Sequence, residues 1–173
     1  MSALLRQTSR RIRALLPILS SLALVLFSLA PVGLPHFDSV GPAFALMAVF
    51  YWSIFRSDLM TMLGAFAIGL LLDLLSGGPI GLNALVLVLA HELGVSQRRV
   101  FLGSSFLVNW AAFALVIGVV LPICWLLMSL LHWELLPMLP LMTQLLLSLA
   151  LYPVIYWMLS RLERRWLRAS VTA

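Results

Sequence analysis

Long apolar segments, separated by short polar links, follow one another along almost the whole chain. A transmembrane helix needs roughly 17–25 predominantly apolar residues to cross about 30 Å of hydrocarbon. Six segments reach or approach this length, at about residues 14–34, 39–55, 59–76, 79–95, 100–131 and 135–160. Hydrophobic residues make up 63% of the chain and charged residues only 10%, which is more apolar surface than one soluble core of 173 residues can bury. We therefore predict an all-α, polytopic membrane protein with six transmembrane helices in a single domain, residues 1–173.

Two of these segments have features of their own. The fifth is too long for one straight crossing and too short for two crossings and a turn. We expect Pro122 to kink or bend it, or part of it to lie outside the hydrocarbon. The second segment ends in Phe50-Tyr51-Trp52, which we interpret as an aromatic anchor at one membrane interface.

The arginines predict how the chain lies in the membrane. All 11 basic residues fall on alternate links of a six-helix arrangement: Arg6, Arg10, Arg11, Arg13, Arg56, Arg98, Arg99, Arg161, Arg164, Arg165 and Arg168. The positive-inside rule then places both termini in the cytoplasm. The last four arginines follow helical spacing, so we expect them to form one face of a helical continuation that meets anionic headgroups.

One carboxylate, Asp73, lies inside the third apolar segment. A charged residue near the centre of a membrane costs about 2.5–3.5 kcal/mol on insertion scales, and less near the ends. Asp73 belongs to a stripe of residues that recur every four positions: Thr61, Ala65, Gly69, Asp73 and Gly77. Small residues at this spacing allow another helix to approach closely. We favour a packing seam, and the alternative is that Asp73 contacts a substrate, an ion or a partner.

The turn after Asp73 is short, so Asp73 and Asn83 should lie at similar depth on neighbouring antiparallel helices. There the carboxylate can accept hydrogen bonds from Asn83, from Ser76, or from free N–H groups at the start of the next helix. Our hypothesis is that Asp73 locks this hairpin. The stripe of small residues is then either used inside the bundle or offered to a partner helix.

No catalytic or metal-binding pattern is evident. His91 and Glu92 are adjacent, so they point about 100° apart on a helix and cannot act as one unit. Either one faces the bundle and the other the headgroups or, as we favour, both lie at the interface. His36, His91 and His132 are scattered over both sides of the membrane, which disfavours a metal site. No nucleophile–base or phosphate-binding motif is present in the sequence. We predict that the protein is not an enzyme and has no catalytic residues, bound metal or cofactor.

The hairpin resembles the signature of the rod shape-determining protein MreD family, in which Gly, Asp, Gly and Gly follow at intervals of four. Family members also tend to have a proline at the start of the second span and a Tyr-Trp pair near its end. The matching residues here are Gly69, Asp73, Gly77 and Gly81, with Pro42, Tyr51 and Trp52. Together with Asn83, these are our structural or interface candidates.

The resemblance implies a non-catalytic, multi-pass component of the bacterial inner membrane that belongs to the cell-elongation machinery. The partner that the resemblance implies is MreC, and a class B penicillin-binding protein and other elongation-complex proteins are further possible partners. With them the protein would help to organise lateral peptidoglycan synthesis. The implied fold is similar to the S-component of energy-coupling-factor vitamin transporters. Membrane lipids are the other partner we expect, and nucleic acid is not one.

That fold likeness supplies an alternative function, the substrate-binding S-component of a vitamin transporter. Such a protein needs a polar pocket that faces outward. The outer half offers few residues for it: Asp38, Asp73, Asn83, His132 and Glu134. Tight vitamin binding would favour the transporter, whereas cell rounding on depletion, or co-purification with MreC, would favour the shape protein.

Overall fold

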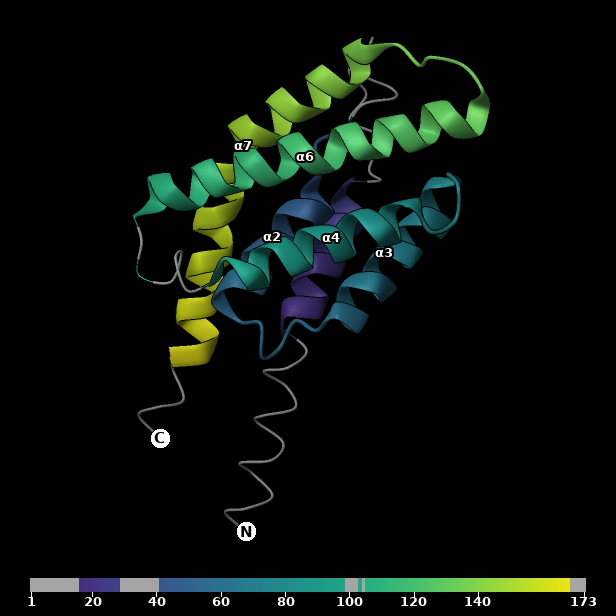
Figure 1. The fold of residues 1–173 in the computed structure, drawn as a ribbon. Coiled ribbons are helices and arrows are strands. Elements are labelled where there is room, and N and C mark those ends of the chain that lie inside the picture. Colours follow the sequence, from purple (N-terminus) through teal and green to yellow (C-terminus); the bar gives the residue numbers. More distant parts are fainter. Residues whose placement is uncertain (1–15, 29–40, 99–102, 104, 169–173) are drawn as a thin grey trace.

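The computed structural model describes residues 16–28, 41–98, 103 and 105–168, and within these ranges the chain is helical with no β-strand (Figure 1). The helices are Leu16–Ser28, α2 (Phe44–Phe55), α3 (Met62–Ser76), α4 (Leu82–Ser96), α6 (Phe106–His132) and α7 (Met138–Arg168). The all-α prediction is confirmed.

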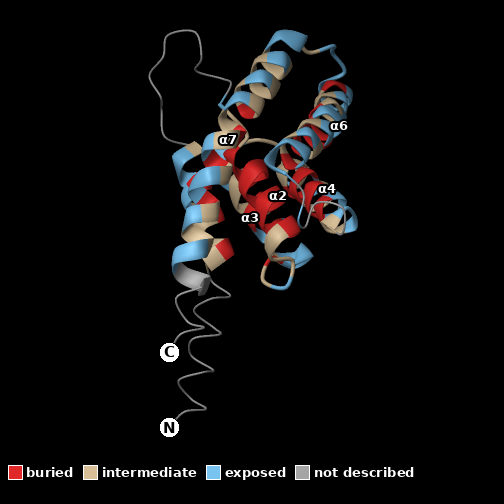
Figure 2. Ribbon diagram, turned by 90° about the vertical axis from the view of Figure 1, so that its left-hand side faces the viewer, coloured by how far each residue is buried: buried red, intermediate tan, exposed pale blue. Residues whose placement is uncertain are grey.

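Helix α2 forms the centre of the bundle. Every residue of α2 except Phe55 is buried, as expected for a helix that is apolar on all sides (Figure 2). Gly94 of α4 lets that helix approach closely, since a Cβ there would lie 3.1 Å from Cβ of Ser53. The core extends to α6 and α7 through Phe113 and Tyr152, whose rings stack with centroids 4.1 Å apart.

The helices differ in length relative to a membrane. Two of those described, α6 and α7 up to Arg165, are long and apolar enough to cross one, by length and composition. The other four are apolar but have between 10 and 17 residues. Even 15 residues rise only about 22 Å, against roughly 30 Å of hydrocarbon. Part of the first two predicted spans lies outside the described residues, and the six-span topology stays a prediction.

Proline lies inside both long helices. Helix α6 continues as one helix through Pro122 and ends at His132, where Trp133 adopts a left-handed conformation with φ of 54°. Helix α7 contains Pro153, and Figure 1 shows it turning part-way along its length, as expected where proline removes a backbone hydrogen bond. It continues to Arg168, so the predicted helical extension beyond the sixth span is confirmed.

Arginines from three separate links gather at one end of the bundle. Nε of Arg98 donates to the carbonyl of Ile54 at 3.0 Å. Arg56 pairs with Asp58 at 3.3 Å. It also lines a pocket together with Arg164 of α7. This grouping is what the positive-inside argument requires, although the side of the membrane on which it lies stays a prediction.

Candidate functional site

The carboxylate of Asp73 accepts four hydrogen bonds from the start of α4. Its Oδ1 accepts from the backbone N–H of Asn83 at 3.0 Å and from Nδ2 of the same residue at 2.9 Å. Its Oδ2 accepts from the N–H groups of Gly81 at 2.8 Å and Ala84 at 3.3 Å. Asp73 is 1% exposed. The contacts to Asn83 and to free N–H groups are those expected from the sequence, so the carboxylate caps α4 from a neighbouring helix.

The sequence explains why α4 needs this cap. The first N–H groups of a helix have no partner within the helix, and the N-cap residue Gly81 has no side chain to offer them. The positive end of the α4 dipole also stabilises a carboxylate at this place. The predicted option of a hydrogen bond from Ser76 to the Asp73 side chain is not found, because the Ser76 hydroxyl donates to the Asp73 backbone carbonyl at 3.4 Å.

At each glycine position of the spaced pattern, the structure shows a separate physical reason for glycine. Gly69 lies against the α4 backbone, since a Cβ there would lie 2.4 Å from Cα of Ala84 and 2.8 Å from the carbonyl of Asn83. Gly77 and Gly81 have φ of 68° and 98°, a left-handed conformation that favours glycine. The pattern therefore describes one close helix–helix contact, one cap and two turns.

The stripe on α3 is used inside the bundle along its central part. Ala65 is fully buried, Gly69 touches α4, and Asp73 caps it. This removes the other option, in which these positions were offered to a partner helix. The ends of the stripe, Thr61 and Gly77, are exposed.

The second group of candidate residues lies at the two ends of α2. Pro42 precedes the helix and its carbonyl accepts from Phe44 N–H at 2.8 Å. Tyr51 donates its hydroxyl to Oε2 of Glu163 in α7 at 2.8 Å, and Nε1 of Trp52 donates to Oγ of Ser20 at 2.9 Å. These bonds tie α2 to α7 and to the helix Leu16–Ser28.

The interpretation of Tyr51 and Trp52 as an aromatic anchor at the membrane interface is wrong. Their exposed fractions are 1% and 0%, and their polar atoms bond to other helices of the chain. A ring with one polar atom suits a membrane interface, but it also suits a buried position with a hydrogen-bond partner. Here the partner was available inside the protein.

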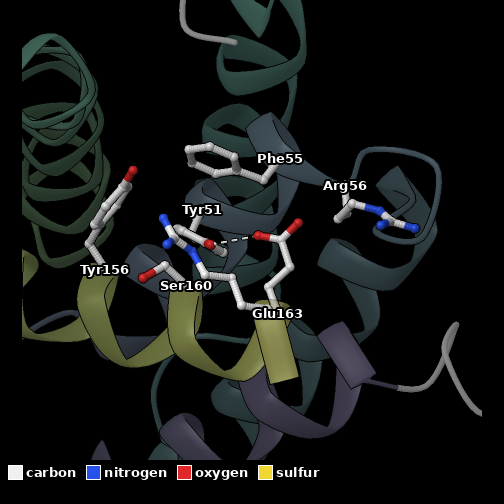
Figure 3. Close-up of a pocket in the computed structure, with 7 residues that line it drawn as sticks. Tyr51, Phe55, Arg56, Tyr156, Ser160 and Glu163 are labelled. Carbon is white, nitrogen blue, oxygen red and sulfur yellow. Dashed lines mark hydrogen bonds between the residues drawn. The ribbon is translucent and has the colours of Figure 1, made fainter. Parts of the chain in front are cut away.

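A polar pocket of about 290 Å³ surrounds the Tyr51–Glu163 bond (Figure 3). The rings of Tyr51 and Phe55 stack at 4.6 Å, and Tyr156 meets Tyr51 edge-on at 5.5 Å. Arg56 and Arg164 complete its charged lining with Glu163. One sign of this site is visible in the sequence, because Glu163 is the single acidic residue among the C-terminal arginines.

His91 and Glu92 also differ from expectation. His91 is buried, with Nε2 2.9 Å from the carbonyl of Met60, whereas Glu92 is exposed. Nδ1 of His91 still lies 3.3 Å from Oε1 of Glu92, so the adjacent pair does interact. The placement of His91 at the interface is wrong, and the other arrangement, with one residue of the pair facing the bundle and one facing outward, is the one found. Through its contact with Met60, His91 links α4 to the segment before α3.

Within the described part of the chain, no three His, Cys, Asp or Glu side chains come together as a metal site would require. His36 and Asp38, which were considered for a metal site and a vitamin pocket, lie outside the described residues. The side chains brought together at the hairpin and around Tyr51 hold helices to one another.

Comparison with protein families decides between the functional classes. The family model for the rod shape-determining protein MreD matches residues 9–162. This range covers most of the chain and includes both groups of candidate residues. The chain belongs to the MreD family. Proteins of this family are described as rod shape-determining, and the vitamin-transporter alternative is not favoured.

A curated relative covers part of this MreD-family chain. An uncharacterized protein of Rickettsia prowazekii (strain Madrid E) is 29% identical over 90 residues, or 52% of this chain and 51% of the relative. The chain thus spans about half the length of the curated relative that it matches. No solved structure matches the chain, so the likeness to the S-component fold stays a prediction.

Proposed function

We propose that this MreD-family chain is a non-catalytic, multi-pass component of the bacterial inner membrane that associates with MreC. In this role it helps to organise lateral peptidoglycan synthesis together with a class B penicillin-binding protein. The observation that carries the proposal is the family match over residues 9–162. The geometry agrees with it, because the buried polar groups of both candidate sites bind other parts of the same chain.

The partner surface must then lie outside the hairpin seam, and α6 offers the best place. Leu115 and Leu126 of α6 are 68% and 62% exposed. Between them lies Gly118, where a Cβ would meet no atom within 4 Å. Ala114 precedes Gly118 by one helical turn, which gives the small-x-x-x-small spacing that lets a second transmembrane helix approach. We place the membrane segment of MreC on this face of α6.

Co-purification from membranes in mild detergent tests both the association with MreC and the assignment of its contact face to α6. The wild-type chain should retain MreC. Gly118→Leu adds bulk in open space, so we expect the chain to fold normally and MreC retention to fall about tenfold, the change that about 1.4 kcal/mol of lost contact produces. Ala67→Leu adds similar bulk at an exposed position of α3 and should retain MreC at the wild-type level.

The outcomes distinguish failure of the proposed function from failure of the α6 assignment alone. Wild-type chain that retains no MreC, in cells that keep their rod shape on depletion, contradicts the proposed function. Normal MreC retention by Gly118→Leu contradicts only the assignment of the α6 face. Tight binding of a vitamin by the purified chain would support the transporter alternative instead.

A further inference from the structure

An apolar groove runs between the helix Leu16–Ser28 and α7, with a volume of about 800 Å³. Its walls include Ala23 and Phe27 on one side and Leu151, Val154 and Met158 on the other. Its polar lining residue Ser20 already accepts a hydrogen bond from Trp52 and donates one to the carbonyl of Pro17. Apart from the indole of Trp157, the lining between Ser20 and the arginine end is therefore apolar.

Two arginines, Arg161 and Arg165, line the same groove at one end. They are one helical turn apart on α7, so their side chains are neighbours. The guanidinium of Arg161 stacks on the ring of Trp157 at 3.9 Å, which holds it in place. Across residues 16–28, 41–98 and 105–165, no carboxylate forms an ion pair with either arginine. The acid nearest to them in sequence, Glu163, accepts a hydrogen bond from Tyr51 instead.

The arginine face expected from the sequence is thus divided between two sites. Arg161 and Arg165 line the groove, whereas Arg164 lines the pocket around Tyr51 and Glu163. The side chain of Arg168 lies outside the described residues. The groove pair can bind a ligand without disturbing the pocket.

The distance along α7 matches one leaflet of a membrane. From Val154 to Arg165, beyond Pro153, the helix rises about 16 Å at 1.5 Å per residue. Half of a hydrocarbon core is about 15 Å. When the apolar walls face acyl chains, the two guanidinium groups therefore reach the depth of the headgroups.

We propose that this groove is a binding site for an anionic phospholipid. One acyl chain lies between the helix Leu16–Ser28 and α7, and the phosphate is bound by Arg161 and Arg165. The guanidinium group suits this ligand, because its N–H groups match two phosphate oxygens at once. Charge complementarity at one end and apolar walls along one leaflet select a lipid over a membrane helix, which would leave both arginines without an anion.

Native mass spectrometry of the full chain in detergent tests this site, with phosphatidylglycerol and phosphatidylcholine of identical acyl chains as probes. We expect wild-type protein to retain the anionic lipid on the order of tenfold better. Arg161→Gln with Arg165→Gln should reduce this preference to within about twofold, since basic residues near the surface supply it. Arg56→Gln with Arg164→Gln removes the same charge from the other pocket and should leave most of the preference intact.

Equal loss of preference in the two double variants would overturn the proposal, because it would mean general attraction to basic charge. Equal retention of both lipids by the wild-type chain would overturn it as well. A photo-crosslinking residue at position 154 provides a readout in cells that does not depend on the arginine variants. Crosslinks to phospholipid are expected, and crosslinks to a protein helix or to a second copy of the chain would contradict the proposed occupant.

Discussion

Gly69 in α3 and Gly118 in α6 are both glycines in the middle of apolar helices, yet their surroundings are opposite. At Gly69 the backbone of α4 occupies the place where a side chain would begin. At Gly118 that place is open. The same residue type therefore marks a completed contact in one region and an unoccupied face in the other.

This difference separates two parts of the molecule. We call the α3–α4 hairpin closed, because each of its special residues contacts or shapes the hairpin itself. The α4 backbone fills the space beside Gly69, the Asp73 carboxylate caps α4, and the left-handed Gly77 and Gly81 form the turn. In helix α6 and the first part of α7, most apolar side chains are at least partly exposed. We infer that the hairpin gives the bundle its shape and that the long helices provide surfaces for lipid and for partners.

Adding a side chain at the two glycines should give the largest contrast. Gly69→Leu forces α3 and α4 apart against backbone atoms, and we expect a loss of about 4 kcal/mol in the free energy of unfolding. Gly118→Leu should change it by less than about 1 kcal/mol, in the stabilising direction, because leucine has the higher helix propensity. Unfolding in detergent, followed by circular dichroism, measures both.

Should Gly69→Leu fail to accumulate, Gly69→Ala still places a Cβ 2.4 Å from Cα of Ala84 and should cost about 2 kcal/mol. Equal stability of the Gly69→Ala and Gly118→Ala variants would contradict the closed hairpin.

Removal of the cap should have the next largest effect. Asp73→Ala leaves the N–H groups of Gly81, Asn83 and Ala84 without the carboxylate, and we expect a loss of roughly 3 kcal/mol. Asn83→Ala removes one of the four hydrogen bonds and should cost about 1 kcal/mol. A double-mutant cycle between the two positions should show coupling, and strictly additive losses would argue against the bond between their side chains.

Substitution of the two left-handed turn glycines should lower the free energy of unfolding by a smaller amount. Gly77→Ala and Gly81→Ala each place a Cβ in a left-handed conformation, at a cost of about 1–2 kcal/mol each. Gly78 lies in the same turn without a positive φ, and a Cβ there would meet its nearest atom at 3.6 Å. Gly78→Ala is therefore the matched control, and equal losses at all three positions would show that the left-handed conformation is not the reason.

A small effect is expected at the other end of the molecule, around Tyr51. Tyr51→Phe removes the hydroxyl that donates to Glu163 and should cost about 1 kcal/mol. Glu163→Gln keeps an acceptor for that hydroxyl and should cost less. A loss as large as that of Asp73→Ala would show that the α2–α7 contact, and not the hairpin, is the principal lock.

Local spacing in the sequence was enough to predict the hairpin. Asp73 and Asn83 lie on either side of a short turn, so capping of α4 follows from helix geometry and from the unpaired N–H groups of any helix start. The bond between Tyr51 and Glu163 joins residues 112 positions apart, and no local pattern encodes it. Periodicity finds neither the partner of Trp52 nor that of His91, because it identifies apolar faces without showing which helix covers them.

The most direct measurement is the amount of MreC retained per folded molecule of the Asp73→Asn variant, with accumulation in membranes and cell shape recorded in the same cells. An amide has one acceptor oxygen in place of two, so the cap is weakened while the exposed faces of α6 and α7 are untouched. We predict less folded protein, with MreC retention per folded molecule at the wild-type level and cell rounding in proportion to the lost protein. Normal accumulation with lost MreC retention would contradict a structural role for Asp73 and make it a contact residue.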